Sequence, residues 1–182
     1  MKILDSPLSG VKIIEPRIFE DARGYFFEAY NTQTFQNLGL HFDFVQDNQS
    51  KSNYGVVRGL HYQLSPKAQT KLVRVLAGVI FDVAVDLRKK SPTYGQWFGV
   101  ELSAENNKQL LVPKGFAHGF SVLSETAVVL YKCDELYSSA HDRGIRFDDA
   151  DLAIDWHLPK DKIKLSEKDT KNAWFKDAEM NF

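Results

Sequence analysis

The sequence predicts an all-β fold, a β-sandwich or barrel with short helices only at its margins. About ten segments of roughly four to eight residues, rich in β-branched and aromatic side chains, alternate with turns. Helical signals are confined to residues 32–38 and to the chain beyond residue 148. A chain of 182 residues fits one domain with a good core, so we expect a single domain over residues 1–182.

The first part of the chain predicts short strands and one helix. Val11 begins a strand that Pro16 ends, and an aromatic-rich segment follows a turn that contains Gly24. A helical segment stops at Gly39, and an alternating segment then runs into a polar group beginning at Gln46. The expected strands cover residues 11–15, 25–30 and 42–45, and the expected helix covers residues 32–38.

The middle of the chain predicts longer and more apolar strands. The strands at residues 71–76 and 79–87 are separated by Ala77 and Gly78 and follow a strand at residues 55–63. Two hairpins are then expected, one from residues 97–102 and 109–112 and one from residues 116–123 and 126–131. In the tail, Ser166 and Asp169 have the spacing of a helix N-cap pair.

Composition and charge exclude several classes of function. The net charge of −1 provides no field that would recruit nucleic acid or an anionic membrane. A single cysteine, Cys133, rules out an intrachain disulfide and fits a reducing compartment. The N-terminus has no long apolar stretch, and apolar runs such as residues 127–131 are too short to span a bilayer. We therefore expect a cytoplasmic protein that binds neither nucleic acid nor membrane.

The strand at residues 55–63 carries a cation, an imidazole and an amide that sheet pairing does not need. The spacing of Gly55, His61 and Gln63, followed by Lys71 and Gly78, resembles the first motif of the cupin jelly roll. Pro113, Gly115 and His118 resemble the second motif. In metal-binding cupins, histidine and glutamate stand where this chain has Gln63 and Lys71. A cation repels a divalent metal and glutamine is a poor transition-metal ligand, so we expect no metal.

A closer resemblance covers nearly the whole chain and rests on eight segments in order. Together they resemble the dTDP-4-dehydrorhamnose 3,5-epimerase family, which belongs to the cupin superfamily. The resemblance implies a jelly roll with short flanking helices. It also implies an isomerase that inverts C3 and C5 of dTDP-4-dehydro-6-deoxy-D-glucose, giving dTDP-4-dehydro-L-rhamnose. The segments are residues 23–28, 44–48, 57–63, 71–74, 82–86, 113–120, 131–133 and 165–169.

Inverting a carbon beside a ketone needs a base, a group that holds the enolate oxygen, and an acid on the opposite face. The ketone is itself the electron sink, so we expect no cofactor. His61 is the candidate base, because an imidazole with an ordinary pKa near 6.5 is both neutral and basic at about pH 7. Lys71 is the candidate for the enolate oxygen, and Tyr131 the candidate acid, with Tyr137 a second choice.

Each of these residues also has a structural alternative. A lone strand histidine is more often a core residue, a lysine at a strand end is usually solvated, and Tyr131 could be a core aromatic residue. The position of Lys71 at a vacated metal-ligand place favours a functional role. The resemblance implies that Asp169 pairs with His61, whereas the sequence alone favours Asp169 as a residue in the first turn of a helix.

The resemblance also implies which residues bind the substrate, a nucleotide sugar. Arg58 stands inside an apolar strand, where a buried cation needs a partner such as a phosphate. Strict alternation places Arg58 and His61 on opposite faces, unless Gly59 introduces a bulge. Asp142 stands where the family often has glutamate, which is longer by one methylene. The implied binding residues are Arg23, Glu28, Gln46, Asn48, Arg58, Lys71, His118, Asp142 and Lys168.

The resemblance further implies a homodimer in which an N-terminal strand crosses into the partner's site and brings Arg23 and Glu28 with it. Three alternatives stay open from the residues. One is an epimerase for a single carbon, one is a ketoisomerase acting on a related nucleotide 4-ketosugar, and one is a non-catalytic cupin that binds nucleotide sugars. A metal-dependent cupin oxygenase is disfavoured by Gln63 and Lys71.

Overall fold

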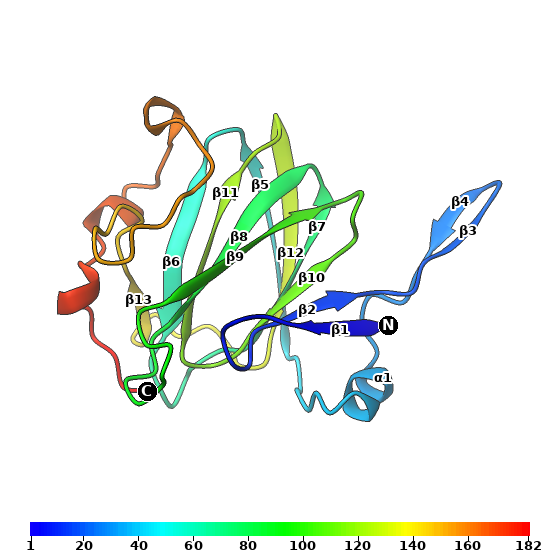
Figure 1. Ribbon diagram of the computed structural model, residues 1–182, viewed down its shortest axis with the longest axis horizontal. Helices are drawn as coiled ribbons and strands as arrows, with labels where there is room; N and C mark the ends of the chain where they lie inside the picture. Colours follow the sequence, from blue (N-terminus) through cyan, green and yellow to red (C-terminus); the bar gives the residue numbers. More distant parts are fainter.

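Two antiparallel sheets face each other in the computed structural model, which describes residues 1–182 (Figure 1). The six-stranded sheet has, in order, β1 (Lys2–Asp5), β2 (Lys12–Glu15), β10 (Gln109–Val112), β7 (Lys71–Ala77), β12 (Thr126–Cys133) and β5 (Gln46–Asn53). The five-stranded sheet has β13 (Asp142–Gly144), β6 (Val57–Gln63), β11 (Phe116–Val122), β8 (Val79–Asp86) and β9 (Trp97–Ser103). The predicted all-β jelly roll is confirmed.

From β5 to β13, consecutive strands alternate between the two sheets, except that β8 and β9 are neighbours in the same sheet. Strand β9 pairs with β8, whereas β10 pairs with β2 and β7 in the other sheet. Strand β11 pairs with β6 and β8, whereas β12 pairs with β5 and β7. Both predicted hairpins are therefore wrong. Two apolar strands joined by a short turn have the same sequence pattern whether they pair with each other or face each other across a core.

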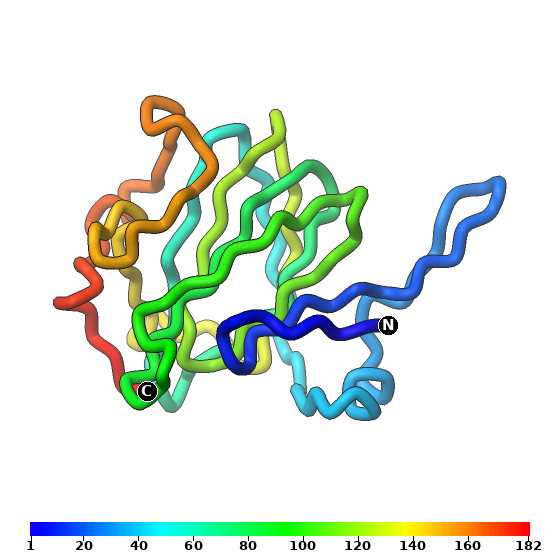
Figure 2. The backbone as a smooth tube through the Cα atoms, in the orientation of Figure 1, coloured from blue at the N-terminus to red at the C-terminus, as the bar shows by residue number.

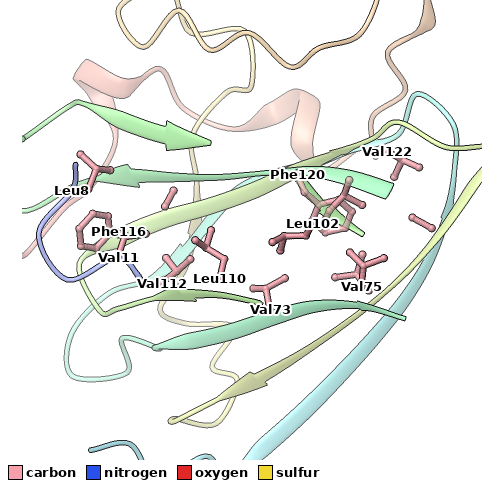
Figure 3. Packing of buried hydrophobic residues seen from close by; sticks show 14 residues of the cluster. Leu8, Val11, Val73, Val75, Leu102, Leu110, Val112, Phe116, Phe120 and Val122 are labelled. Carbon is pink, nitrogen blue, oxygen red and sulfur yellow. The ribbon is translucent and has the colours of Figure 1, made fainter. Parts of the chain in front are cut away.

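A cluster of 14 buried hydrophobic residues fills the space between the sheets (Figure 3). Val73, Val75 and Leu110 come from the six-stranded sheet and face Leu102 and Phe120 of the five-stranded sheet. A second cluster of 13 residues lies between the five-stranded sheet and the C-terminal segment. Strand β8 is consequently buried on both faces, which explains its nearly continuous apolar sequence.

The N-terminal region departs from the sheets as an arm. Strands β3 (Phe19–Asp21) and β4 (Gly24–Phe26) form a hairpin that projects from the body (Figure 2). The predicted strand at residues 25–30 is thus wrong beyond Phe26, because its partner β3 has only three residues. Helix α1 (Thr32–Asn37) follows, capped by Asn31 Oδ1, which accepts from the Thr34 N–H at 3.1 Å. The predicted helix is confirmed to within one residue.

The predicted strand at residues 42–45 is wrong, because the strand begins at Gln46, in the polar group. Strand β5 lies at the edge of its sheet, and its inward side chains Gln46, Asn48, Ser50 and Ser52 are all polar. Its outward side chains face solvent. Neither face therefore has the apolar side chains from which a strand is predicted.

The C-terminal segment winds over the outer face of the five-stranded sheet (Figure 1). Its helical signals correspond to 3₁₀ turns at Lys160–Lys162, Asp169–Lys171 and Phe175–Asp177. The Asp169 N–H donates to Ser166 Oγ at 3.1 Å, as the predicted cap pair requires. Strands β1 and β13 were not predicted. None of the helices has the length and apolar character needed to cross a membrane.

Candidate active site

A cavity of about 210 Å³ lies between the two sheets and is lined mostly by polar side chains. A second cavity, of about 170 Å³, shares His61, Lys71 and Tyr131 with the first. These three residues therefore stand where the two cavities meet. The remaining residues of the first cavity are Gln49, Ser50, Arg58, His118 and Phe120. The largest hollow, about 580 Å³ at residues 147–163, contains none of the predicted site residues.

His61 of β6 is hydrogen-bonded to Asp169 of the C-terminal segment. Its Nε2 lies 2.5 Å from Asp169 Oδ1. Burial raises the pKa of Asp169, but the hydrogen bond and charge of His61, together with Ser166 and Lys168, outweigh it and leave that pKa below its ordinary value. An ionised Asp169 holds the proton on Nε2, so Nδ1 is the ring nitrogen left for a substrate.

Arg58 and His61 lie on the same face of the sheet. In the pairing of β6 with β11, Arg58 stands opposite Phe120 and His61 stands opposite His118. Two residues of β6, Gly59 and Leu60, therefore face only one residue of β11, which is a bulge. The bulge brings Arg58 into the cavity with His61, and Arg58 Nε donates to Ser52 Oγ at 3.0 Å. Strict alternation would have placed Arg58 and His61 on opposite faces, and the bulge places them on the same face.

Lys71 and Tyr131 lie on neighbouring strands of the opposite sheet. Lys71 Nζ is 5.8 Å from the centroid of the Tyr131 ring. The carboxylates around the site pair with His61, His118 and Lys168, so Lys71 has no carboxylate partner. Burial lowers the pKa of Lys71, although acidic groups nearby oppose this shift. Burial also raises the pKa of Tyr131, which keeps its phenol protonated.

His118 forms a second imidazole–carboxylate pair with Asp82, a residue that the sequence did not identify. His118 Nε2 lies 2.7 Å from Asp82 Oδ1, and Asp82 is completely buried in β8. The available sequence signal was a carboxylate in the middle of β8, an apolar strand whose only other charged residue is its last, Asp86. His118 also stands directly across from His61, so two histidines, each held by an aspartate, line one cavity.

Two of the predicted binding residues lie away from the cavities. Arg23, in the arm, pairs with Asp21 at 2.6 Å. Glu28 accepts from Asn31 and Thr34 beside α1. The structure therefore does not bring Arg23 and Glu28 to the site of their own chain.

Four further predicted binding residues, Gln46, Asn48, Asp142 and Lys168, lie at or near the second cavity. Lys168 and Asp142 form an ion pair in its wall. Gln46 Nε2 donates to Asn48 Oδ1 at 3.0 Å, and Asn48 Nδ2 lies 3.7 Å from Cys133 Sγ. Gln46 therefore already uses one amide hydrogen and its carbonyl oxygen in hydrogen bonds to the protein.

Comparison with known proteins identifies the family. Residues 5–177 match the family model described as dTDP-4-dehydrorhamnose 3,5-epimerase. The chain belongs to this family. It is therefore an enzyme, a carbohydrate epimerase.

Relatives in the dTDP-4-dehydrorhamnose 3,5-epimerase family are similar over almost their full lengths. The Shigella flexneri enzyme is 50% identical over 180 residues, which is 98% of each chain. The crystal structure of the Elizabethkingia anophelis NUHP1 enzyme has a TM-score of 0.93 and 56% identity over 97% of both chains. A Legionella pneumophila Philadelphia 1 epimerase, crystallised with dTDP-4-keto-L-rhamnose, has a TM-score of 0.93 and 48% identity over 97% of this chain and 93% of its own.

Proposed function

We propose that this chain inverts C3 and C5 of dTDP-4-dehydro-6-deoxy-D-glucose, and that His61, Lys71, Tyr131 and Asp169 carry the chemistry. Both carbons flank the C4 ketone, so removing either proton gives an enolate. The observation that carries the assignment is that the base and the acid stand on facing sheets. His61 is on β6 of the five-stranded sheet and Tyr131 is on β12 of the six-stranded sheet. A sugar ring between them would have one group on each face.

Proton removal is the role of His61. Its free Nδ1 takes the proton from carbon, and the C–H electron pair moves through the C3–C4 or C4–C5 bond onto the ketone oxygen. Asp169 accepts a hydrogen bond from Nε2 and stabilises the imidazolium that forms. The Lys71 ammonium, which has no carboxylate partner, stabilises the enolate oxygen. One well-placed donor of this kind contributes roughly 3–4 kcal/mol to the transition state.

Return of the proton to the opposite face is the role of Tyr131. Its raised pKa keeps the phenol protonated, so a proton is available for the enolate carbon. Arg58 and His118 line the same cavity, and Arg58 suits the diphosphate because guanidinium binds phosphate oxygens in pairs. We assign Lys168 and Asp142, with Gln46 and Asn48, to the wall that holds the rest of the nucleotide sugar.

Incubation of the nucleotide 4-ketosugar in D2O tests the assignment. Deuterium should enter both C3 and C5. The His61→Asn variant should exchange at neither carbon, and Tyr131→Phe should lose epimerisation more than exchange. Deuterium at C3 alone would indicate an epimerase for a single carbon, and tight binding with no exchange would indicate a binding protein.

We also propose that the chain works as a homodimer in which the β3–β4 arm reaches the partner's cavity. The arm projects from the body and stands apart from both sheets (Figure 2), and Phe26 in it is 70% exposed. Arg23 and Glu28 lie outside the cavity of their own chain, which such an exchange would explain. Sedimentation equilibrium should give twice the chain mass. The buried free thiol of Cys133 fits a cytoplasmic enzyme, which cell fractionation would test.

A further inference from the structure

The loop at residues 134–141, which connects β12 to β13, contributes one residue to the wall of the second cavity. It presents Tyr137, whose side chain lines that cavity although the residue is 58% exposed. An exposed aromatic residue on a connecting loop keeps a fixed position only when its backbone is anchored. The hydrogen bonds that hold the backbone of this loop therefore determine where Tyr137 lies in the site.

Two glutamines hold three consecutive residues of the loop. Gln63 Nε2 donates to the Leu136 carbonyl at 3.3 Å, and Gln63 Oε1 accepts from the Ser138 N–H at 2.7 Å. Between them, the Tyr137 N–H donates to Gln46 Oε1 at 2.9 Å. Gln63 is on β6 and Gln46 is on β5, so the loop is tied to both sheets.

The tip of the Tyr137 side chain is also tied down. The Tyr137 hydroxyl donates to Asp142 Oδ2 at 3.2 Å, and the same carboxylate pairs with Lys168. The ring and the Lys168 ammonium thus share one carboxylate beside His61. Movement of the loop would displace Tyr137 and remove its hydrogen bond to the carboxylate that pairs with Lys168.

Both amide hydrogens of Gln63 and its carbonyl oxygen are engaged by the protein backbone. Gln63 is only 4% exposed, and its second amide hydrogen goes to the Lys67 carbonyl at 2.6 Å. A buried amide is costly unless it is hydrogen-bonded. Here two of the three bonds go to backbone of the 134–141 loop and the third goes to the Lys67 carbonyl, so Gln63 anchors that loop.

We propose that Gln63 is a positioning residue for substrate binding. It fixes the 134–141 loop so that Tyr137 and Lys168 meet the nucleotide sugar, and it takes no part in proton transfer. This inference rests on the proposed function, because it concerns the substrate of the same site.

The test compares Gln63→Leu with wild type. We expect KM to rise about tenfold while kcat stays within roughly threefold, because the loop contributes to binding and not to chemistry. Deuterium should still enter both C3 and C5. Hydrogen exchange at the Ser138 amide should become faster, whereas exchange in β8 should not change. Asn181→Ala is the matched control, because it removes two side-chain amide bonds from Ser65 on a neighbouring loop and should leave KM unchanged.

Gln63→Glu covers the case in which Gln63→Leu fails to fold. It keeps the acceptor for Ser138 and places a carboxylate oxygen against two carbonyls, so KM should again rise. An unchanged KM in a folded variant with a faster Ser138 amide would overturn the inference, and so would a fall in kcat at constant KM. A failure of the proposed function can be told apart from a failure of this inference, because the wild-type enzyme would then incorporate no deuterium at C3 or C5.

Discussion

At the scale of single residues, burial shifts the pKa values of Lys71 and Tyr131 in opposite directions. It lowers the pKa of Lys71 from its ordinary 10.5 and raises that of Tyr131 from its ordinary 10.0. Burial disfavours the charged form of each group, which is the cation for lysine and the anion for tyrosine. Burial therefore moves the loss of the Lys71 charge to lower pH and the loss of the Tyr131 proton to higher pH.

The alkaline limb of the pH–rate profile should consequently report Lys71. Activity needs the Lys71 cation, so it should fall as pH rises through a pKa below 10.5. Lys71→Arg should move this limb upward, because arginine stays charged beyond about pH 12. In the Tyr131→Phe variant, whose activity is measured as deuterium exchange, the alkaline limb should stay at the same pH. The assignment would be contradicted if Tyr131→Phe abolished the alkaline limb and Lys71→Arg left it unchanged.

The residues of the site were easier to anticipate than their geometry. The family resemblance selected His61, Lys71, Tyr131 and Asp169. The fold brings the first three to adjoining cavities and places Asp169 in hydrogen-bond contact with His61. The face of Arg58 could not be predicted, because it depends on how β6 pairs with β11. Asp82 was missed because its partner His118 is 36 residues away in the chain. Such pairs depend on tertiary contacts that a local pattern does not contain.

At the scale of elements, most strands could be placed from the sequence, whereas their pairings could not. Strand β8 was predicted to within one residue because it is apolar on both faces. Strand β5 was misplaced because its inward side chains are polar and serve the site. Local hydrophobicity thus locates strands that build the core, and it fails for a strand that lines a polar cavity.

The bulge in β6 should depend on Gly59. Its φ is +123°, and a Cβ there would lie 2.6 Å from the Gly119 Cα and 2.8 Å from the His118 carbonyl oxygen. Gly59→Ala should therefore cost about 1–3 kcal/mol of unfolding free energy and most of the activity, because Arg58 and His61 lose their common face.

Urea unfolding and epimerase assays check the Gly59 prediction. Gly39→Ala is the matched control, since Gly39 also has a positive φ of +77° but has no atom within 4 Å of a built Cβ. The difference between the two variants isolates the steric clash. Equal destabilisation by both would argue against a special role for the bulge.

The turn after β8 should give the enzyme acid-dependent stability. Burial raises the pKa of Asp86, but hydrogen bonds from Arg88, Ser91 and Thr93 outweigh it and lower that pKa from 3.8 to about 2. A carboxylate whose pKa is lower in the folded state stabilises the fold at any pH above its unfolded-state pKa, here by about 2 kcal/mol. This stabilisation is lost as pH falls from about 4 to about 2.

Comparison of Asp86→Asn with wild type by urea unfolding at several pH values checks this prediction. The variant should be less stable near pH 6 and should show a flatter acid dependence. Asp21→Asn is the matched control. Asp21 makes a similar pair with Arg23 two residues later, but both are exposed, so little stability should change. Equal losses in the two variants would contradict the role of burial.

At the scale of the whole molecule, the arm is the feature that a single chain does not explain. It exposes Phe19, Tyr25 and Phe26, and it carries Arg23 away from the cavity of its own chain. Exposed aromatic residues on a protruding element are typical of a surface that a partner covers. In a symmetric dimer the exchange would be reciprocal, and each site would combine residues of two chains.

Mixing two inactive variants would test this exchange directly. His61→Asn lacks the base but keeps an intact arm, whereas the double variant Arg23→Ala with Glu28→Ala keeps the base and loses the arm contacts. If arms cross, a hybrid dimer has one complete site. Random reassociation makes half the dimers hybrid, so about a quarter of wild-type activity should return. His61→Asn mixed with Tyr131→Phe is the control, because both residues come from the same chain and a crossed arm restores neither. No recovery in the first mixture, despite hybrids seen by native mass spectrometry, would mean that each arm serves its own chain.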